Sequence, residues 1–264
     1  MASFTSDGVR IAYDDLSPSA PAERTIVLIH GFASNRSEGW KRTGWYGAFE
    51  RRRTRVIALD QRGHGESEKL YDPDAYRREK LAGDVLALMD QLGVLRADLF
   101  GYSMGVRTAL AVALAAPERV SNLILGGVGG KLLEPSPAVV GEPMADAMLA
   151  EDPSIIAEPM LRSFRQFADE QGEDRRALAA VTRVKNPPFA RDALAALPMP
   201  VLVVAGHGDT GAGDPEGLAC IFPNGHAVAV AGCDHFSAIP HALTKAAVFD
   251  FLDGLLDDDF PAFE

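Results

Sequence analysis

The chain of 264 residues is long enough for one large domain, and its 47% hydrophobic and 24% charged residues are typical of a folded protein. Its 37 acidic and 26 basic residues give a formal net charge of −11, which repels phosphate backbones and argues against nucleic acid as a partner. The two cysteines, Cys220 and Cys233, are too few for a disulfide framework. No signal peptide and no apolar stretch of about 20 residues is visible, so we expect a cytoplasmic protein without a membrane partner.

The strand-like segments are short, continuous apolar runs, a pattern typical of parallel strands covered on both faces. They lie at residues 25–29, 55–59, 97–100, 122–125, 200–204 and 227–230. Residues 4–13 precede them and predict an antiparallel hairpin that turns at Asp7–Gly8. Helical patterns at 79–92 and 104–116 alternate with the strands. The sequence therefore predicts an α/β fold, with a mostly parallel central sheet and helices on both of its faces.

Residues 131–197 interrupt this alternation. They contain no strand-like run, and prolines separate their helical stretches. The stretches lie at 144–150, 155–168, 174–184 and 190–197. We interpret the segment as a helical cap, residues 131–197, inserted into a core domain formed by residues 1–130 and 198–264.

The sequence Gly101-Tyr102-Ser103-Met104-Gly105 fits the G-x-S-x-G pattern of a nucleophile elbow. In such an elbow, a serine lies on a tight turn between a strand and a helix, and side chains at the two glycines would collide with these elements. The pattern alone also fits a glycine-rich turn with a passive serine. A predicted strand directly before it and a predicted helix directly after it favour the elbow.

A second motif, His30-Gly31-Phe32, follows the first core strand. A loop at this place can direct a backbone N–H into the crevice at the carboxyl ends of the strands. Together with the N–H of Met104, it could bind a developing oxyanion. Taken alone, the motif fits equally a strand-end turn in which His30 is a structural hydrogen-bonding residue.

Residues 60–67 also follow a strand and include His64, which could be mistaken for a catalytic base. We favour a structural role for this loop. We expect Asp60, Arg62 and His64 to hold it in place through hydrogen bonds and charge.

Two further polar residues, Asp209 and His235, each follow a predicted strand by a few residues. A serine hydroxyl needs a base with a pKa near ~6.5, hence a histidine, and a carboxylate that orients that histidine. The chain order Ser103, Asp209, His235 is the order found in this class of elbow. Asp214 remains a rival acid and His207 a rival base.

Taken together, these motifs resemble the α/β-hydrolase fold superfamily over nearly the whole chain. The resemblance implies that Ser103 is the nucleophile, His235 the base and Asp209 the orienting acid. It also implies that the N–H groups of Phe32 and Met104 form the oxyanion hole. Relatives that use aspartate as nucleophile, the haloalkane dehalogenases and epoxide hydrolases, are excluded by the serine.

The substrate pocket is less clearly marked. Tyr102 and Phe236 flank catalytic positions, and Trp45 follows the oxyanion loop, so we expect these three aromatic residues as apolar pocket walls. Trp45 could equally pack a helix onto the sheet. Arginines in the cap could hold a substrate carboxylate, although their spacing does not favour this over a solvated helix face. They are Arg162, Arg165, Arg175 and Arg176.

The sequence thus predicts a serine hydrolase, resembling a carboxylesterase, that acts on a small, mainly apolar carbonyl compound. It shows no metal-ligand spacing, and we expect no metal and no cofactor. Two alternatives stay open. One is a carbon–carbon bond or enol-lactone hydrolase with the same triad, and the other is a small-molecule-binding protein on a hydrolase scaffold. No motif indicates an oligomeric state.

Overall fold

The computed structural model describes residues 2–134 and 140–256, and within these residues eight strands form a single sheet. The strands are β1 (Ala2–Ser6), β2 (Val9–Leu16), β3 (Arg24–Ile29), β4 (Thr54–Leu59), β5 (Ala97–Tyr102), β6 (Val120–Gly126), β7 (Val201–Gly206) and β8 (Gly225–Val230). Their order is β1-β2-β4-β3-β5-β6-β7-β8. The pairs that involve β2 are antiparallel and all the others are parallel. The predicted hairpin and the six predicted strands are confirmed.

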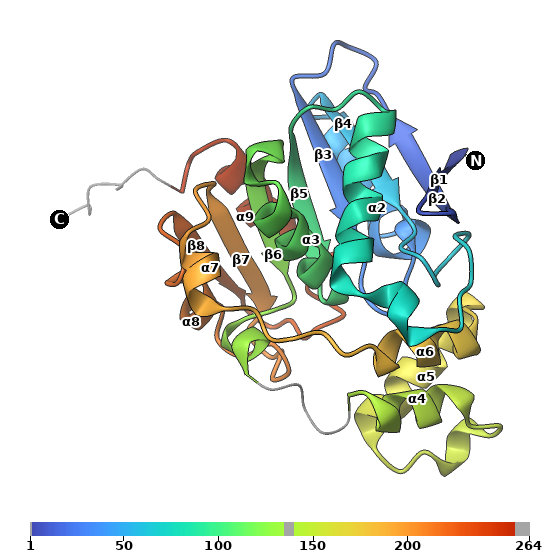
Figure 1. Cartoon of the computed structure of the whole chain (residues 1–264). Coiled ribbons are helices and arrows are strands. Elements are labelled where there is room, and N and C mark those ends of the chain that lie inside the picture. The colour runs from blue at the N-terminus through green and yellow to red at the C-terminus, as the bar shows by residue number, and fades with distance from the viewer. Residues whose placement is uncertain (1, 135–139, 257–264) are drawn as a thin grey trace.

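Helices cover both faces of the sheet (Figure 1). On one face, α2 (Arg78–Gln91), α3 (Met104–Ala115), α7 (Arg191–Ala195) and α8 (Pro215–Ala219) share a hydrophobic core with the strands. On the other face, α1 (Trp45–Glu50) and α9 (Ala242–Leu252) form a second core. All residues of β5 and β7 are buried, which explains their continuous apolar sequences. Among the helices of the described residues, none is both long and apolar enough to cross a membrane.

Three helices lie apart from these two cores, at the end of the sheet toward which the parallel strands run (Figure 1). They are α4 (Glu142–Leu149), α5 (Pro159–Gln171) and α6 (Arg175–Arg183), which we call the α4–α6 layer. The layer has its own hydrophobic cluster, which Ala33 of the core joins. Residues 189, 194 and 197 pack instead in the core of the sheet. The layer is therefore shorter than the predicted cap range of 131–197, because α7 packs on the sheet.

Short helical turns complete the chain. They are η1 (Ser37–Lys41), η2 (Pro73–Tyr76), η3 (Pro117–Arg119), η4 (Gly130–Leu133) and η5 (Pro153–Ile155). The turn η1 follows the loop after β3, and η2 packs against α6. Both therefore lie close to the carboxyl end of the sheet, where the candidate site is found.

Candidate active site

Ser103 occupies the sharp turn between β5 and α3. Its backbone has φ 54° and ψ −114°, a left-handed conformation that a serine adopts at a cost of about 1–3 kcal/mol. The two glycines of the motif permit the turn. A Cβ on Gly105 would lie 2.1 Å from the Ile29 carbonyl oxygen, and one on Gly101 would lie 2.5 Å from the Gly105 oxygen. The motif thus has the backbone geometry expected of a nucleophile elbow.

A chain of hydrogen bonds joins Ser103 to His235 and Asp209. The Ser103 Oγ lies 3.0 Å from His235 Nε2, and His235 Nδ1 lies 2.6 Å from Asp209 Oδ2. The carboxylate accepts a hydrogen bond from the Nδ1–H group, which leaves Nε2 as an acceptor for the serine hydroxyl. The other Asp209 oxygen accepts from the N–H groups of Gly211 and Ala212, so the carboxylate is held on both sides.

The Asp209 and His235 side chains differ in burial. The Asp209 side chain is 4% exposed, whereas the His235 side chain is 24% exposed. A buried carboxylate interacts with the imidazole with little screening by water. The more exposed imidazole can reach both the serine and a bound molecule.

The two rival residues lie outside this chain. His207 is exposed. Asp214 precedes α8, and its side chain accepts the N–H of Glu216 at the start of that helix. Asp209 and His235, which the sequence favoured, are the residues that the fold places beside Ser103.

The loop after β3 passes close to Ser103. A Cβ on Gly31 would lie 3.3 Å from the Ser103 Cβ, so this position favours glycine. The Gly31 carbonyl oxygen accepts from His30 Nδ1 at 2.8 Å and from the Ser34 N–H at 3.3 Å. Because the C=O and N–H of a trans peptide point in opposite directions, these bonds also fix the direction of the Phe32 N–H. Met104 begins α3, and its N–H belongs to the first turn, where N–H groups have no acceptor within the helix.

His30 itself is held by hydrogen bonds to residues that were not predicted from the sequence as part of the site. Its Nε2 accepts the Gln61 N–H at 3.0 Å, and the Gln61 side chain donates to the His30 carbonyl oxygen at 2.7 Å. Thr108 then donates to Gln61 Oε1 at 2.6 Å. Burial lowers the pKa of His30, so its ring is held neutral. No spacing in the sequence marks Gln61 or Thr108, because their partners come from distant segments.

The loop of residues 60–67 has the predicted structural role. Asp60 accepts the N–H groups of Arg36 and Glu66, and its carboxylate also pairs with the Arg36 guanidinium. Arg62 forms two hydrogen bonds, of 2.8 and 2.6 Å, with the buried carboxylate of Asp84. His64 is fully buried, and burial lowers its pKa well below the ordinary value, so it does not meet the requirements of a base that reaches a substrate.

The three predicted pocket aromatics have three different positions. Trp45 is fully buried in the core between α1 and α9, and its Nε1 donates to the Ile239 carbonyl oxygen. The prediction of a pocket wall is wrong for Trp45, because its ring fills the core instead. Tyr102 is also buried, and its hydroxyl donates to the His235 carbonyl oxygen at 2.6 Å, so it supports the histidine loop. Phe236 is 47% exposed and packs edge-on against the His235 ring.

Aromatic rings from the core and from the α4–α6 layer meet beside this site. Phe164 of α5 lies 5.9 Å from Phe32 and 5.8 Å from Phe236, measured between ring centroids. Phe167 lies 5.9 Å from Phe236. A row of rings therefore connects the loop beside the serine with the histidine loop. These contacts form an apolar surface beside the site.

The four arginines of this region have partners within the layer or, for Arg176, on the neighbouring core segment. Arg165 binds the carbonyl oxygens of Ala147 and Ala150, and Arg162 binds that of Ile156. Arg175 binds the Ala150 carbonyl oxygen, and Arg176 lies over the Tyr71 ring. None of these contacts directs a guanidinium toward Ser103.

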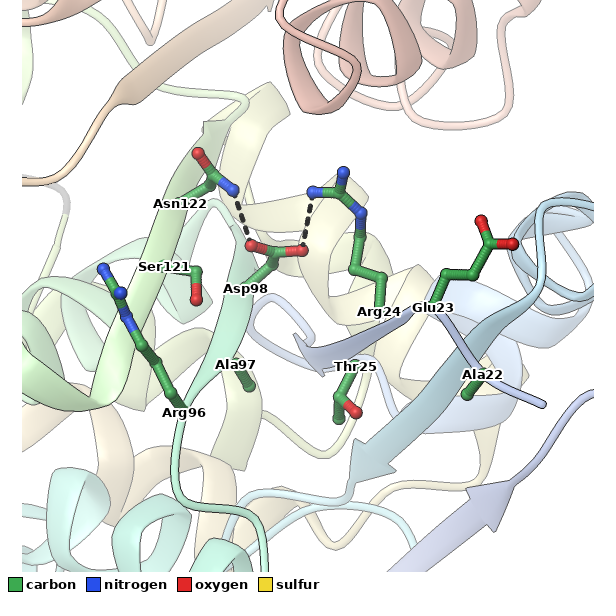
Figure 2. Close-up of a pocket in the computed structure, with 9 residues that line it drawn as sticks. All are labelled: Ala22, Glu23, Arg24, Thr25, Arg96, Ala97, Asp98, Ser121 and Asn122. Atoms are coloured by element: carbon green, nitrogen blue, oxygen red, sulfur yellow. Dashed lines mark hydrogen bonds and ion pairs between the residues drawn. The ribbon is translucent and has the colours of Figure 1, made fainter.

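A polar hollow of about 380 Å³ lies at the opposite end of the sheet, at the amino ends of β3, β5 and β6 (Figure 2). There Asp98 accepts from Arg24 at 3.2 Å and from Asn122 at 2.7 Å. Open α/β sheets bind ligands at the carboxyl ends of their strands. The position of this hollow and the mutual pairing of its side chains distinguish it from the site at Ser103. In the described ranges, 2–134 and 140–256, no group of three histidine, cysteine or acidic residues could hold a metal ion.

A family model described as the alpha/beta hydrolase fold matches residues 24–178, more than half of the chain. The chain belongs to this family. A 2-hydroxy-6-oxononadienedioate/2-hydroxy-6-oxononatrienedioate hydrolase of Paraburkholderia phymatum is 38% identical over 128 residues, which cover 46% of this chain and 42% of that protein. The chain thus spans less than half the length of that curated relative in the match.

Solved α/β-hydrolase structures match over nearly the whole chain. A hydrolase from Pseudomonas aeruginosa is 26% identical, with a TM-score of 0.74, over 95% of this chain and 97% of that one. The enol-lactonase from Burkholderia xenovorans is also 26% identical, with a TM-score of 0.68, over 96% of this chain and all of that one (100%). The predicted fold class is confirmed.

Proposed function

We propose that the protein is a serine hydrolase that cleaves a carboxylic ester, or a similar carbonyl compound, through an acyl-enzyme intermediate. The observation that carries the proposal is the continuous hydrogen-bonded chain from Asp209 through His235 to a serine in a strained elbow. A serine that only stabilised a turn would need neither an imidazole at 3.0 Å nor a carboxylate behind that imidazole.

In the first half of the reaction, Ser103 Oγ attacks the carbonyl carbon while His235 Nε2 takes the hydroxyl proton. Asp209 stabilises the resulting imidazolium and keeps its orientation. The oxyanion accepts from the N–H groups of Phe32 and Met104, each of which contributes about 3–4 kcal/mol to stabilising the transition state. His235 then gives its proton to the leaving oxygen, and the carbon–oxygen bond breaks.

In the second half, a water molecule attacks the acyl-enzyme. His235 takes a proton from this water, and the same two N–H groups hold the second oxyanion. The Ser103 oxygen leaves as the hydroxyl after receiving the proton from His235. The acid product is released and the hydrogen-bonded chain is restored.

The substrate is proposed to be small or medium-sized and mainly apolar. Phe32, Phe164 and Phe236 form the ring contacts beside the site, and flat or branched apolar groups pack well on such surfaces. We propose that the α4–α6 layer is the cap, which supplies Phe164 and also Phe167, whose ring packs against Phe236. A planar acyl group would lie against them while its carbonyl carbon faces Ser103.

The test is covalent labelling with a fluorophosphonate probe, followed by intact mass measurement and peptide mapping. We expect one adduct, on the peptide that contains Ser103. The variant Ser103→Ala should fold with the same circular dichroism spectrum, form no adduct and lose measurable turnover of aryl esters. Absence of an adduct on folded wild-type protein would overturn the proposal and favour a binding protein on the same scaffold.

One observation favours a second candidate, a carbon–carbon bond or enol-lactone hydrolase that acts on an anionic substrate. Arg107 lies one helical turn after Met104 on α3 and is half-buried, and burial lowers its pKa. Within the described part of the chain, it forms no hydrogen bond or ion pair with an acidic side chain, and its charge adds to the effect of burial in lowering the pKa of Arg78. A guanidinium in this state suits a substrate carboxylate, and the relative from P. phymatum is named for dioate substrates.

A substrate panel separates the two candidates. It should contain neutral aryl esters, neutral enol lactones and their carboxylate-bearing analogues. The second candidate predicts a clearly higher kcat/KM for the carboxylate-bearing compounds, and an increase in their KM of about tenfold or more in Arg107→Leu. Equal kcat/KM for charged and neutral members would favour the esterase.

A further inference from the structure

Glu173 is a carboxylate of the α4–α6 layer that is buried against the core. It lies in the turn between α5 and α6, where Gly172 has a left-handed backbone and the Glu173 N–H donates to the Ala168 carbonyl oxygen. This closed turn fixes the direction in which the side chain leaves the layer. The side chain is only 2% exposed.

The carboxylate binds two separate loops of the core. Its oxygens accept the N–H of Gly65 at 2.9 and 3.1 Å, and Oε1 also accepts from the Asn35 side-chain amide at 3.1 Å. Lys69 lies 4.0 Å away. Burial raises the pKa of Glu173, so the charged form has an unfavourable environment that these donors offset. An apolar side chain would avoid this cost but would leave the Gly65 N–H and the Asn35 amide without their acceptor, so the carboxylate serves these two loops as well as packing.

Both loops lead directly to the candidate site. Asn35 is three residues after Phe32, and its Oδ1 accepts the N–H groups of Ser37 and Glu38 at the start of η1. Gly65 belongs to the loop in which Asp60 accepts the N–H of Arg36. Glu173 thus contacts Asn35, within the segment that carries the Phe32 N–H, and Gly65, in the loop that is hydrogen-bonded to Arg36 of the same segment. The same segment touches the layer through Ala33, which is fully buried in the cluster formed by α4, α5 and α6.

We propose that Glu173 is a positioning residue that holds the Gly31–Arg36 segment against the α4–α6 layer, and so keeps the Phe32 N–H in place beside Ser103. This inference rests on the proposed function, since the N–H matters only if an oxyanion forms there. Glu173 touches no reacting atom. It acts through Asn35 and Gly65.

In the Asn35–Glu173 hydrogen bond, Asn35 is the donor and Glu173 the acceptor, so exchanging the amide and the carboxylate between the two positions tests the contact. Glu173→Gln keeps one oxygen that can accept from Asn35 and Gly65, but it replaces Oε2, which lies 2.9 Å from the Gly65 nitrogen, with an amide donor. Asn35→Asp keeps the acceptor for Ser37 and Glu38 but sets two carboxylates against each other. In the double variant, the new amide at position 173 can donate to the new carboxylate at position 35, while the oxygen of that amide still accepts from Gly65. Glu170→Gln is the matched control, because Glu170 is an exposed residue of α5 that undergoes the same charge change.

The readouts are kcat and KM for an aryl ester, measured well below the unfolding temperature, and amide hydrogen exchange. We expect each single variant to lower kcat about tenfold or more with a smaller change in KM, because a misplaced oxyanion donor weakens the transition state more than the ground state. The double variant should recover most of the loss, and Glu170→Gln should have no effect. Exchange of the Gly65 and Phe32 amides should rise in the single variants and fall again in the double variant.

Two results would overturn the inference. One is single variants that unfold at lower temperature but keep the wild-type kcat, which is the signature of a merely structural contact. The other is a double variant no better than the single ones in kcat and exchange. If wild-type protein forms no serine adduct, the proposed function fails separately. The exchange of the Gly65 and Phe32 amides then still decides whether Glu173 holds the segment.

Discussion

The two ends of the central sheet place polar side chains in contrasting environments. At the carboxyl ends of the strands, Ser103 has a strained backbone and faces a partly exposed histidine. At the amino ends, Asp98 belongs to a regular strand and is paired with Arg24 and Asn122. The first arrangement holds the proposed nucleophile in a strained turn, whereas the second pairs a buried carboxylate with two neighbouring side chains. Substitutions at the carboxyl ends should therefore lower activity, whereas substitutions at the amino ends should lower the free energy of unfolding.

The largest expected effect is at the histidine of the carboxyl end. His235→Asn removes the only group within hydrogen-bond reach of Ser103 Oγ among the described residues, so kcat/KM should fall by about 10⁴-fold or more. His207→Asn is the matched control, because His207 is exposed on the neighbouring loop and should tolerate the change. Steady-state kinetics with an aryl ester measures both. A large loss in the His207 variant would contradict the assignment.

Asp209→Asn should have the next largest effect. An amide cannot hold the His235 tautomer with Nδ1 protonated as a carboxylate does, so kcat should fall by about 10³–10⁴-fold with little change in KM. Asp214→Asn is the control, since its Oδ1 still caps α8. Equal losses in the two variants would show that the acid has been misassigned.

The amino end should respond in the opposite way. Asp98→Ala leaves the half-buried Arg24 and Asn122 donors without their shared carboxylate, so the free energy of unfolding should fall by about 1–2 kcal/mol. Urea denaturation measures this loss. The kcat of the folded variant should stay within about twofold of wild type, because its groups lie at the far end of the strands. A variant of full stability, or one with a much lower kcat, would remove the contrast between the two ends.

The sequence predicted most of the fold because its signals are local. Continuous apolar runs marked the strands, and the glycines around Ser103 marked an elbow whose close contacts the structure shows. Trp45, predicted as a pocket wall, and α7, predicted as part of the cap, show what local signals cannot predict. Whether an aromatic side chain or a short helix faces a pocket or a core depends on distant segments, such as Ile239 for Trp45, that no local pattern reveals.

Some residues of the candidate site could be predicted from local sequence signals, and others could not. Ser103, Asp209 and His235 follow strand ends, and parallel strands bring those ends together, so their proximity could be predicted. Glu173 and Gln61 could not be predicted. Each is a single polar residue whose partners lie at least 30 positions away in the chain, and only the folded structure shows that the donors point toward it.

The smallest expected effect concerns the buried histidine beside the site. Burial lowers the pKa of His64 well below its ordinary value of 6.5, so the folded state resists a proton that the unfolded chain accepts. The stability of the neutral ring is fully present above pH 6.5 and is lost as the pH falls below that value. With falling pH, the free energy of unfolding should therefore decline more steeply in wild type than in His64→Asn, by a difference that approaches about 1.4 kcal/mol per pH unit below pH 6.5. Urea denaturation between pH 7 and pH 5 measures the difference, and His207→Asn should keep the wild-type slope. If the free energy of unfolding has the same pH dependence in wild type and His64→Asn, His64 accepts a proton in the folded protein as readily as in the unfolded chain. The ring of His64 would then be charged within the buried loop beside Phe32.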